Sequence, residues 1–417
     1  MIAKLQSTAL FGVDAFIVEV EVDVSKGLPS FNIVGLPDVA VQESKERVRS
    51  AIKNSEYQFP MQRITVNLAP ADVKKEGPAL DLPIALGILI ANGQVKRFPK
   101  SKFVIIGELS LNGEIRSING VLSIALMAKK LGIDNLLIPH KNAKEAAIID
   151  KLNIFPITHL REVVRFLNQE IEIKPICIDK KEIMQHKEQY QVDFHDVKGQ
   201  EHAKRALEVA AAGGHNVIMV GPPGSGKTML AHRIPTILPS LTLNESIEIT
   251  RLYSVSNLFN YENPIIAKRP FRSPHHTISN IGLIGGGRMP KPGEISLAHN
   301  GVLFLDEIPE FNKSALEALR QPLEDRCVTI TRTLRSVSYL SNFMLVAASN
   351  PCPCGYFGDP VKQCTCSAYQ IQKYRSKISG PLMDRIDIQI EVPRLNYKDM
   401  MHRGIHGDSS YEIRKRV

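Results

Sequence analysis

The chain has 417 residues, of which 43% are hydrophobic and 23% charged, and this ordinary globular composition excludes a disordered, collagen-like or fibrous protein. Its formal net charge is +9, with 21 Lys and Arg against 17 Asp and Glu in residues 1–165 and 31 against 26 in residues 166–417. Because the excess is spread along the chain, it permits a polyanionic partner without requiring one. No apolar run is long enough to cross a bilayer and no signal peptide is recognised, and with only six cysteines we expect a reducing, cytoplasmic location.

Residues 1–165 alternate between strand and helix patterns. Apolar residues recur at every second position in residues 15–24 and 63–68, which predicts two half-buried strands. Helices are predicted over 39–52, 81–91 and 121–131, short strands over 103–106 and 135–139, and a hairpin turn at Asn112-Gly113. These elements predict an α/β or α+β domain.

The composition changes after residue 165. Residues 166–195 are rich in Lys, Glu and Gln with little apolar periodicity, which predicts a linker. A second domain is predicted over residues 196–417, with helices over 203–212 and 229–238 and continuous apolar strands over 216–220, 302–305 and 343–348. Such strands are typical of a parallel sheet that is covered on both faces.

A glycine-rich motif follows the strand predicted at 216–220. The octapeptide Gly221-Pro222-Pro223-Gly224-Ser225-Gly226-Lys227-Thr228 fits the phosphate-loop pattern G-x-x-x-x-G-K-[ST] at every position. Its glycines let backbone N–H groups form an anion nest at a helix start, where Lys227 can reach the β- and γ-phosphates. The Thr228 hydroxyl can bind Mg²⁺. The motif therefore predicts a binding site for a nucleoside triphosphate and Mg²⁺.

Two acids follow the apolar strand at 302–305. We expect Asp306 to hold Mg²⁺ through water and Glu307 to polarise the attacking water, which favours hydrolysis over storage of the nucleotide. A strand that ends in two solvated acids is the alternative, and the phosphate loop earlier in the chain makes it less favoured.

A few further residues complete the predicted site. Asn350 ends the strand at 343–349 and can orient the water beside the γ-phosphate. Arg385 is a candidate arginine finger, a residue that stabilises transition-state charge and often acts from a neighbouring subunit, although a surface Arg–Asp pair is the commoner fate of such a string. Val197 and the Gly199-Gln200 turn precede the first helix of this domain and are placed to border the adenine ring.

Four of the six cysteines lie within 15 residues, namely Cys352, Cys354, Cys364 and Cys366. Four thiolates around Zn²⁺ would stabilise a small knuckle that has too little core of its own. The C-x-C spacing is unusual for zinc, and free thiols or a redox role are the alternatives.

Together these residues resemble the AAA+ ATPases of the magnesium-chelatase-like branch, and most closely the YifB/ComM family of competence-related ATPases. The resemblance covers almost the whole chain and rests on these strings: Phe31-Asn-Ile-Val-Gly-Leu-Pro-Asp38, Gly77-Pro-Ala-Leu-Asp-Leu-Pro83, Gly199-Gln200, Arg272-Ser-Pro-His-His-Thr277, Pro292-Gly-Glu-Ile-Ser-Leu-Ala-His-Asn-Gly301 and Asn350-Pro-Cys-Pro-Cys-Gly355.

The resemblance implies that residues 1–165 are similar to the proteolytic domain of Lon. Lon-type proteolysis needs a serine nucleophile and a lysine base. A hand alignment places Ala79 and Leu122 at those two positions. Neither side chain can do that chemistry, so we expect this domain to be proteolytically inactive and to serve as a scaffold for ring assembly or DNA contact.

The resemblance also implies two pore loops. Residues 271–292 look like the helix-2 insert that chelatases share with minichromosome maintenance helicases, and the hairpin at 328–339 occupies the pre-sensor position. Arg288 and Lys291 in the insert, and Arg332 and Arg335 in the hairpin, are therefore candidate contacts to DNA phosphates. A charged surface hairpin is an equally good interpretation of the sequence alone.

The function that the family resemblance implies is an ATP-hydrolysing motor, a homo-hexameric ring that acts on DNA as a helicase or branch-migration enzyme in natural transformation. No base-reading motif is present, so we expect DNA binding to be independent of sequence. A chelatase-type motor that remodels a protein partner for metal insertion is the second hypothesis, and a protease or protease regulator is the third.

The family's helical lid should begin about where the sequence ends, at Val417, so we expect the lid to be missing and turnover and ring assembly to be affected.

Overall fold

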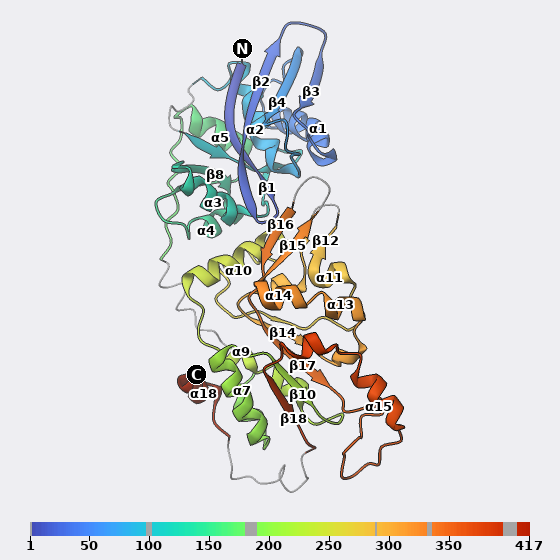
Figure 1. The fold of residues 1–417 in the computed structure, drawn as a ribbon. Coiled ribbons are helices and arrows are strands. Elements are labelled where there is room, and N and C mark those ends of the chain that lie inside the picture. Colours follow the sequence, from blue (N-terminus) through green and yellow to red (C-terminus); the bar gives the residue numbers. More distant parts are fainter. Residues whose placement is uncertain (1, 97–101, 180–189, 288–289, 332–335, 395–406) are drawn as a thin grey trace. The chain divides into compact units, whose positions relative to one another are not determined.

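The computed structural model describes residues 2–96, 102–179, 190–287, 290–331, 336–394 and 407–417. The chain forms two compact units, the first from residues 1–185 and 253–265 and the second from residues 186–252 and 266–417. Each unit is a mixture of helices and strands (Figure 1). The α/β fold class that the sequence predicted is therefore confirmed.

The first unit is built on a seven-stranded mixed sheet with strand order β3-β4-β2-β1-β5-β8-β9. β1–β2 and β2–β4 are antiparallel and the other pairs are parallel. The strands are β1 (Ile2–Phe11), β2 (Asp14–Ser25), β3 (Ser30–Val34), β4 (Arg63–Ala69), β5 (Phe103–Ile105), β8 (Asn135–Pro139) and β9 (Asn153–Ile157), with a small hairpin of β6 (Glu108–Leu109) and β7 (Ile115–Arg116). The four strands and the hairpin predicted here are confirmed.

Strand β1 was not foreseen from the sequence. It pairs with β2 along its whole length, from Ile2 opposite Asp23 to Phe11 opposite Asp14. Its buried positions include the polar residues Ser7 and Thr8, which weaken the alternating apolar pattern that identifies a strand.

Three helices of the first unit were predicted and are confirmed: α1 (Val39–Asn54), α2 (Asp81–Ala91) and α3 (Val121–Lys130), which α4 (Ala143–Ala146) and α5 (Leu160–Leu167) accompany. α1 begins where the Asp38 carboxylate accepts the N–H of Val41 at 2.8 Å. α2 packs on β1 and β2, and a Cβ at Gly87 would lie only 2.5 Å from a methyl carbon of Val22. The glycine lets the helix approach the sheet closely.

A buried ion pair joins α1 to α2. The Arg47 guanidinium donates to both carboxylate oxygens of Asp81, at 2.7 and 3.1 Å, and the Asp81 side chain is fully buried. Burial raises the pKa of Asp81 to about 6, although Arg47 acts in the opposite direction. Because this value lies above the unfolded-state pKa of about 3.9, the Asp81 carboxyl favours folding most below about pH 4. That contribution is lost as the pH rises through about 6.

Replacing Arg47 by Met is expected to lower the free energy of unfolding of the first unit by about 3–5 kcal/mol at pH 7, because the Asp81 carboxylate then stays buried without a counter-charge. The loss should be smaller at pH 5, where Asp81 takes up a proton. Differential scanning calorimetry of the full chain at both pH values measures the effect, with Lys53→Met at an exposed position of α1 as the control. An equal loss at pH 7 and pH 5 would contradict this account.

Residues 253–265 belong to the first unit although the chain on both sides belongs to the second. The Ser254 hydroxyl donates to Glu145 Oε1 at 2.6 Å and accepts the N–H of Gly120 at 2.9 Å. Glu145 is buried, which raises the pKa of its carboxyl. The segment is thus held by a buried polar network, which hydrophobic periodicity does not reveal.

The second unit contains a five-stranded parallel sheet with strand order β11-β14-β17-β10-β18. The strands are β11 (Phe271–Arg272), β14 (Val302–Leu305), β17 (Met344–Ser349), β10 (Val217–Val220) and β18 (Ile388–Glu391). Neighbouring residues of one strand pack into different hydrophobic cores: Val302 and Phe304 lie in one, Leu303 and Leu305 in the other. The prediction of a parallel sheet covered on both faces is confirmed.

The helices of this unit supply the two cores. On one face lie α7 (Glu201–Gly213), α8 (Lys227–Ala231), α9 (Ile234–Ile237) and α18 (Ser410–Arg416), and on the other α11 (Asn280–Ile284), α12 (Glu294–Leu297), α13 (Lys313–Glu317) and α16 (Gly380–Met383). α10 (Leu243–Val255), α14 (Arg320–Asp325) and α15 (Ala368–Arg375) complete the set of described helices with more than three residues. None of the described helices has the length and apolarity needed to cross a membrane.

The single helix predicted over 229–238 is wrong. The structure has two short helices there, α8 from Lys227 and α9 from Ile234. Pro235 explains the break, because its ring would clash with the carbonyl group four residues earlier and it has no N–H to donate.

Candidate nucleotide-binding site

The phosphate-loop motif lies between β10 and α8, as its spacing predicts. Gly224 and Gly226 have φ values of 76° and 93°, in the left-handed region that favours glycine. A Cβ at Gly221 would collide with the carbonyl oxygen of Val392, which follows the neighbouring strand β18. The glycines are therefore required for the turn and for the close approach of two backbones.

Lys227 is the first residue of α8, and its side chain is largely buried. Its ammonium group donates to the carbonyl oxygens of Gly221 and Pro222 at 2.6 and 3.0 Å and to Asn350 Oδ1 at 3.4 Å. Burial lowers the pKa of Lys227, and the carboxylates of Asp306 and Glu307 oppose this shift. The structure thus brings two predicted residues, Lys227 and Asn350, into contact.

Thr228 and Asp306 are also brought together. The Thr228 hydroxyl donates to Asp306 Oδ2 at 2.8 Å, and the other Asp306 oxygen accepts the N–H of Glu307 at 3.0 Å. A hydroxyl and a carboxylate are the oxygen ligands that Mg²⁺ uses beside nucleotide phosphates. The side chains present at this point therefore fit a magnesium ion.

The strand order explains the assembly of these groups. β10, β17 and β14 are adjacent and parallel, so the phosphate loop, Asn350 and Asp306 follow the carboxyl ends of three neighbouring strands. Glu307 has a φ of 51°, which is uncommon for a residue other than glycine. This conformation turns the chain directly after Asp306, so two acidic residues follow β14 in succession.

Gln200 was predicted, with Gly199 and Val197, to border the adenine ring, but its contact with the phosphate loop was not foreseen. Its side-chain amide donates to the carbonyl oxygens of Ser225 at 3.2 Å and Pro393 at 2.7 Å, so it ties the phosphate loop to the segment after β18. The Gly199-Gln200 string was the available signal. Val197 is buried in the hydrophobic core, and its contact with the adenine ring stays a prediction.

Comparison with known proteins agrees with this geometry. Residues 193–400 match the family model described as magnesium chelatase, subunit ChlI, and residues 20–142 match that described as subunit ChlI of Mg-chelatase. The competence protein ComM of Haemophilus influenzae is 44% identical, over 100% of this chain and 81% of that protein. The protein YifB of Escherichia coli is 42% identical, over 99% of this chain and 80% of that protein. This chain belongs to the YifB/ComM family.

The YifB/ComM chain also resembles Lon protease in part: the enzyme of Endomicrobium trichonymphae is 27% identical over 175 residues, which are 39% of this chain and 22% of that protein. Ala79 lies in a short 3-10 helix, Pro78–Leu80, and Leu122 is buried in α3. The proteolytic inactivity that these two residues indicate stays a prediction.

Arg385 lies away from the nucleotide site of its own chain. It precedes β18, whose first residue, Ile388, lies opposite Val217 at the amino end of β10. The phosphate loop follows the carboxyl end of β10, so the length of a four-residue strand, about 13 Å, separates the two ends. Within its own chain the guanidinium pairs with Glu324.

Of the four candidate DNA contacts in this YifB/ComM chain, Arg288, Arg332 and Arg335 lie outside the described residues. Lys291 is exposed in β13 (Lys291–Pro292), which pairs with β12 (Gly285–Gly286).

The predicted hairpin is confirmed as β15 (Cys327–Thr331) and β16 (Ser336–Leu340). The buried Tyr339 of β16 donates its hydroxyl to the carbonyl oxygen of Pro290 at 2.6 Å. This hydrogen bond therefore joins the insert to the hairpin.

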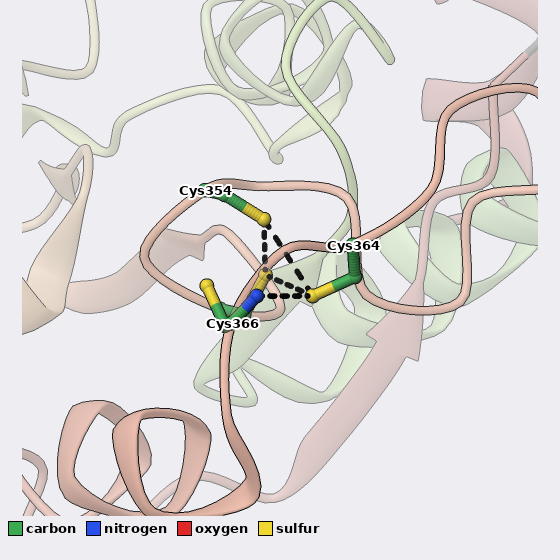
Figure 2. Close-up of side chains that lie close together, drawn as sticks. Cys354, Cys364 and Cys366 are labelled. Carbon is green, nitrogen blue, oxygen red and sulfur yellow. Dashed lines mark hydrogen bonds between the residues drawn. The ribbon is translucent and has the colours of Figure 1, made fainter.

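The four clustered cysteines are brought together at one point of the loop that joins β17 to α15. Their sulfur atoms all lie within 4.8 Å of one another. Figure 2 shows Cys354, Cys364 and Cys366 gathered in this way. Backbone N–H groups of Thr365 and then Tyr356 lower the pKa of the Cys354 thiol to about 5. Together, these four cysteines could hold a soft metal ion.

Proposed function

We propose that this chain is an ATP-hydrolysing motor that acts on DNA, as a helicase or branch-migration enzyme. The observation that carries the hydrolytic part is the contact of Lys227 with the phosphate loop and of Thr228 with Asp306, which Glu307 directly follows in the chain. A protein that only stored the nucleotide would not need this second carboxylate.

In the proposed reaction, Lys227 exchanges its loop carbonyl partners for the β- and γ-phosphates. Thr228 and Asp306 would hold Mg²⁺, which would supply positive charge to neutralise that developing on the phosphates. Glu307 accepts a proton from the attacking water, and the Asn350 amide orients that water beside the γ-phosphate. All five side chains follow the carboxyl ends of neighbouring strands, because β14, β17 and β10 are adjacent in the sheet.

We propose a ring because of the position of Arg385 in the sheet. A guanidinium at the amino end of the sheet cannot reach the nucleotide of its own chain, so an arginine finger at this position must act on a neighbouring subunit. Repeated around a homo-hexamer, this arrangement would place one arginine at each interface. The pairing with Glu324 would hold the guanidinium extended before assembly.

DNA is proposed as the partner on two grounds. The relative that is 44% identical is named a competence protein. Lys291 is exposed in the insert, and the hydrogen bond from Tyr339 to Pro290 joins the insert to the hairpin. Binding through phosphates alone would be independent of sequence and sensitive to salt.

A motor that remodels a protein partner for metal insertion is the second candidate, and the match of both units to chelatase-subunit family models favours it. The two candidates differ in their response to DNA. The ATP hydrolysis rate should rise several-fold with single-stranded or branched DNA, and the stimulation should fall as salt is raised. Robust hydrolysis with neither DNA binding nor stimulation would exclude the DNA motor and favour the protein-remodelling one.

A further inference from the structure

The four-cysteine loop has the geometry of a metal site. The Cys352 sulfur lies 3.3 Å from that of Cys354 and 3.7 Å from that of Cys364, and the last two are 3.6 Å apart. A disulfide needs an S–S distance of about 2.05 Å. Four sulfurs at about 2.3 Å from a tetrahedral zinc ion are about 3.8 Å from one another. We propose that Cys352, Cys354, Cys364 and Cys366 hold one Zn²⁺, and that this ion braces the ATP site.

The backbone around the sulfurs supports thiolate ligands. The N–H of Phe357 donates to Cys352 Sγ at 3.3 Å, and the N–H of Cys366 donates to Cys364 Sγ at 3.4 Å. Hydrogen bonds of this kind orient the ligands of a metal and stabilise the charge of a thiolate. The loop is thus shaped around its sulfur atoms.

The loop has little regular structure and little buried apolar surface to hold its conformation. Residues 351–366 contain neither helix nor strand. Its large apolar side chains do not form a core, since Phe357 is 46% and Val361 is 73% exposed. A segment with so little buried apolar area usually needs a metal ion or a covalent link to adopt one structure.

The metal loop lies directly against the nucleotide site. A Cβ at Gly355 would be 2.7 and 2.8 Å from the ring carbons of Pro223, in the phosphate loop. Asn350, whose amide oxygen contacts Lys227, precedes the first cysteine by two residues. The ion would therefore fix both Pro223 and the turn that carries Asn350.

The inference rests on the nucleotide site but not on DNA as the partner, so it is tested without DNA. The chain, purified under reducing conditions without chelator, should contain about one zinc per molecule by inductively coupled plasma mass spectrometry. Replacement of zinc by Co²⁺ should give the thiolate charge-transfer and visible bands of a tetrahedral sulfur site. Cys364→Ser should lose most of the metal, whereas Cys177→Ser, at an exposed cysteine of the first unit, should retain it.

The zinc content and the cobalt spectrum of the wild-type chain test the proposal even if Cys364→Ser fails to fold. A chain that contains no zinc and gives no cobalt bands on reconstitution would overturn the proposal. Mass spectrometry of the alkylated protein then separates four free thiols from a disulfide, and either result counts against the metal.

A matched pair of glycine substitutions tests whether the metal loop supports the nucleotide site. Gly355 and Gly358 have φ values of 84° and 81°, but only Gly355 has an atom that a Cβ would meet. Gly355→Ala should weaken the binding of a fluorescent ATP analogue by roughly tenfold, as should removal of the zinc, and Gly358→Ala should change it little. Equal affinities for both variants, or unchanged affinity after removal of the metal, would show that the loop does not support the site.

Discussion

Replacing Glu307 by Gln is expected to slow ATP hydrolysis by about 10²–10⁴-fold, because the amide cannot accept the proton of the attacking water. Nucleotide binding should persist, since Lys227, Thr228 and Asp306 contact one another or the phosphate loop without involving the Glu307 side chain. Phosphate release measures the first quantity, and equilibrium binding of a fluorescent ATP analogue measures the second.

Glu310→Gln is the matched control for this variant. Glu310 lies three residues further along the chain, and its carboxylate pairs with Lys377 at 3.1 Å rather than facing the phosphate loop. Its replacement should leave the hydrolysis rate nearly unchanged. A Glu307→Gln variant that hydrolyses ATP at the wild-type rate would remove Glu307 from the catalytic machinery.

Replacing Arg385 by Ala is expected to lower the hydrolysis rate of the assembled protein by about 10³–10⁵-fold, the range typical of an arginine finger. The position of Arg385 at the opposite end of the sheet from its own phosphate loop makes a stronger test available. In a mixture with Lys227→Ala, which cannot bind nucleotide properly, some interfaces combine an intact phosphate loop with an intact Arg385. Such a mixture should recover part of the activity that both variants lack alone.

Two outcomes would contradict this role for Arg385. The first is a mixture no more active than its components under conditions in which the chains associate. The second is an equal loss of activity in Arg320→Ala, a half-buried arginine of α14 that pairs with Glu317 and serves as the control. The Arg385 pairing with Glu324 would then be a structural surface contact.

Much of the nucleotide site could be predicted from local sequence. The spacing of the phosphate loop fixes which residues turn and which begin the helix, because only glycine adopts the φ values found at Gly224 and Gly226 without strain. Likewise, four consecutive apolar residues before Asp306 indicate a strand buried on both faces. The phosphate-loop spacing and the apolar strand depend on residues close in sequence. This is why the structure confirms both predictions.

Other features depended on packing between distant parts of the chain. The sequence gives no sign that Ser254 joins the first unit, because its partner Glu145 lies 109 residues earlier. The contact of Gly355 with Pro223 and the bond from Tyr339 to Pro290 are of the same kind. Strand β1, with its buried serine and threonine, is identified by its pairing with β2 rather than by its own pattern.

The sequence by itself therefore determined the phosphate loop, the two acids after the apolar strand, the cysteine cluster as a candidate metal site and the parallel sheet. The tertiary structure decided which of these lie together: Lys227 beside Asn350, and Thr228 beside Asp306. It also separated Arg385 from the phosphate loop of its own chain. The physical reason is that backbone preferences and apolar periodicity act over a few residues, whereas strand order and side-chain packing are fixed only when the whole core forms.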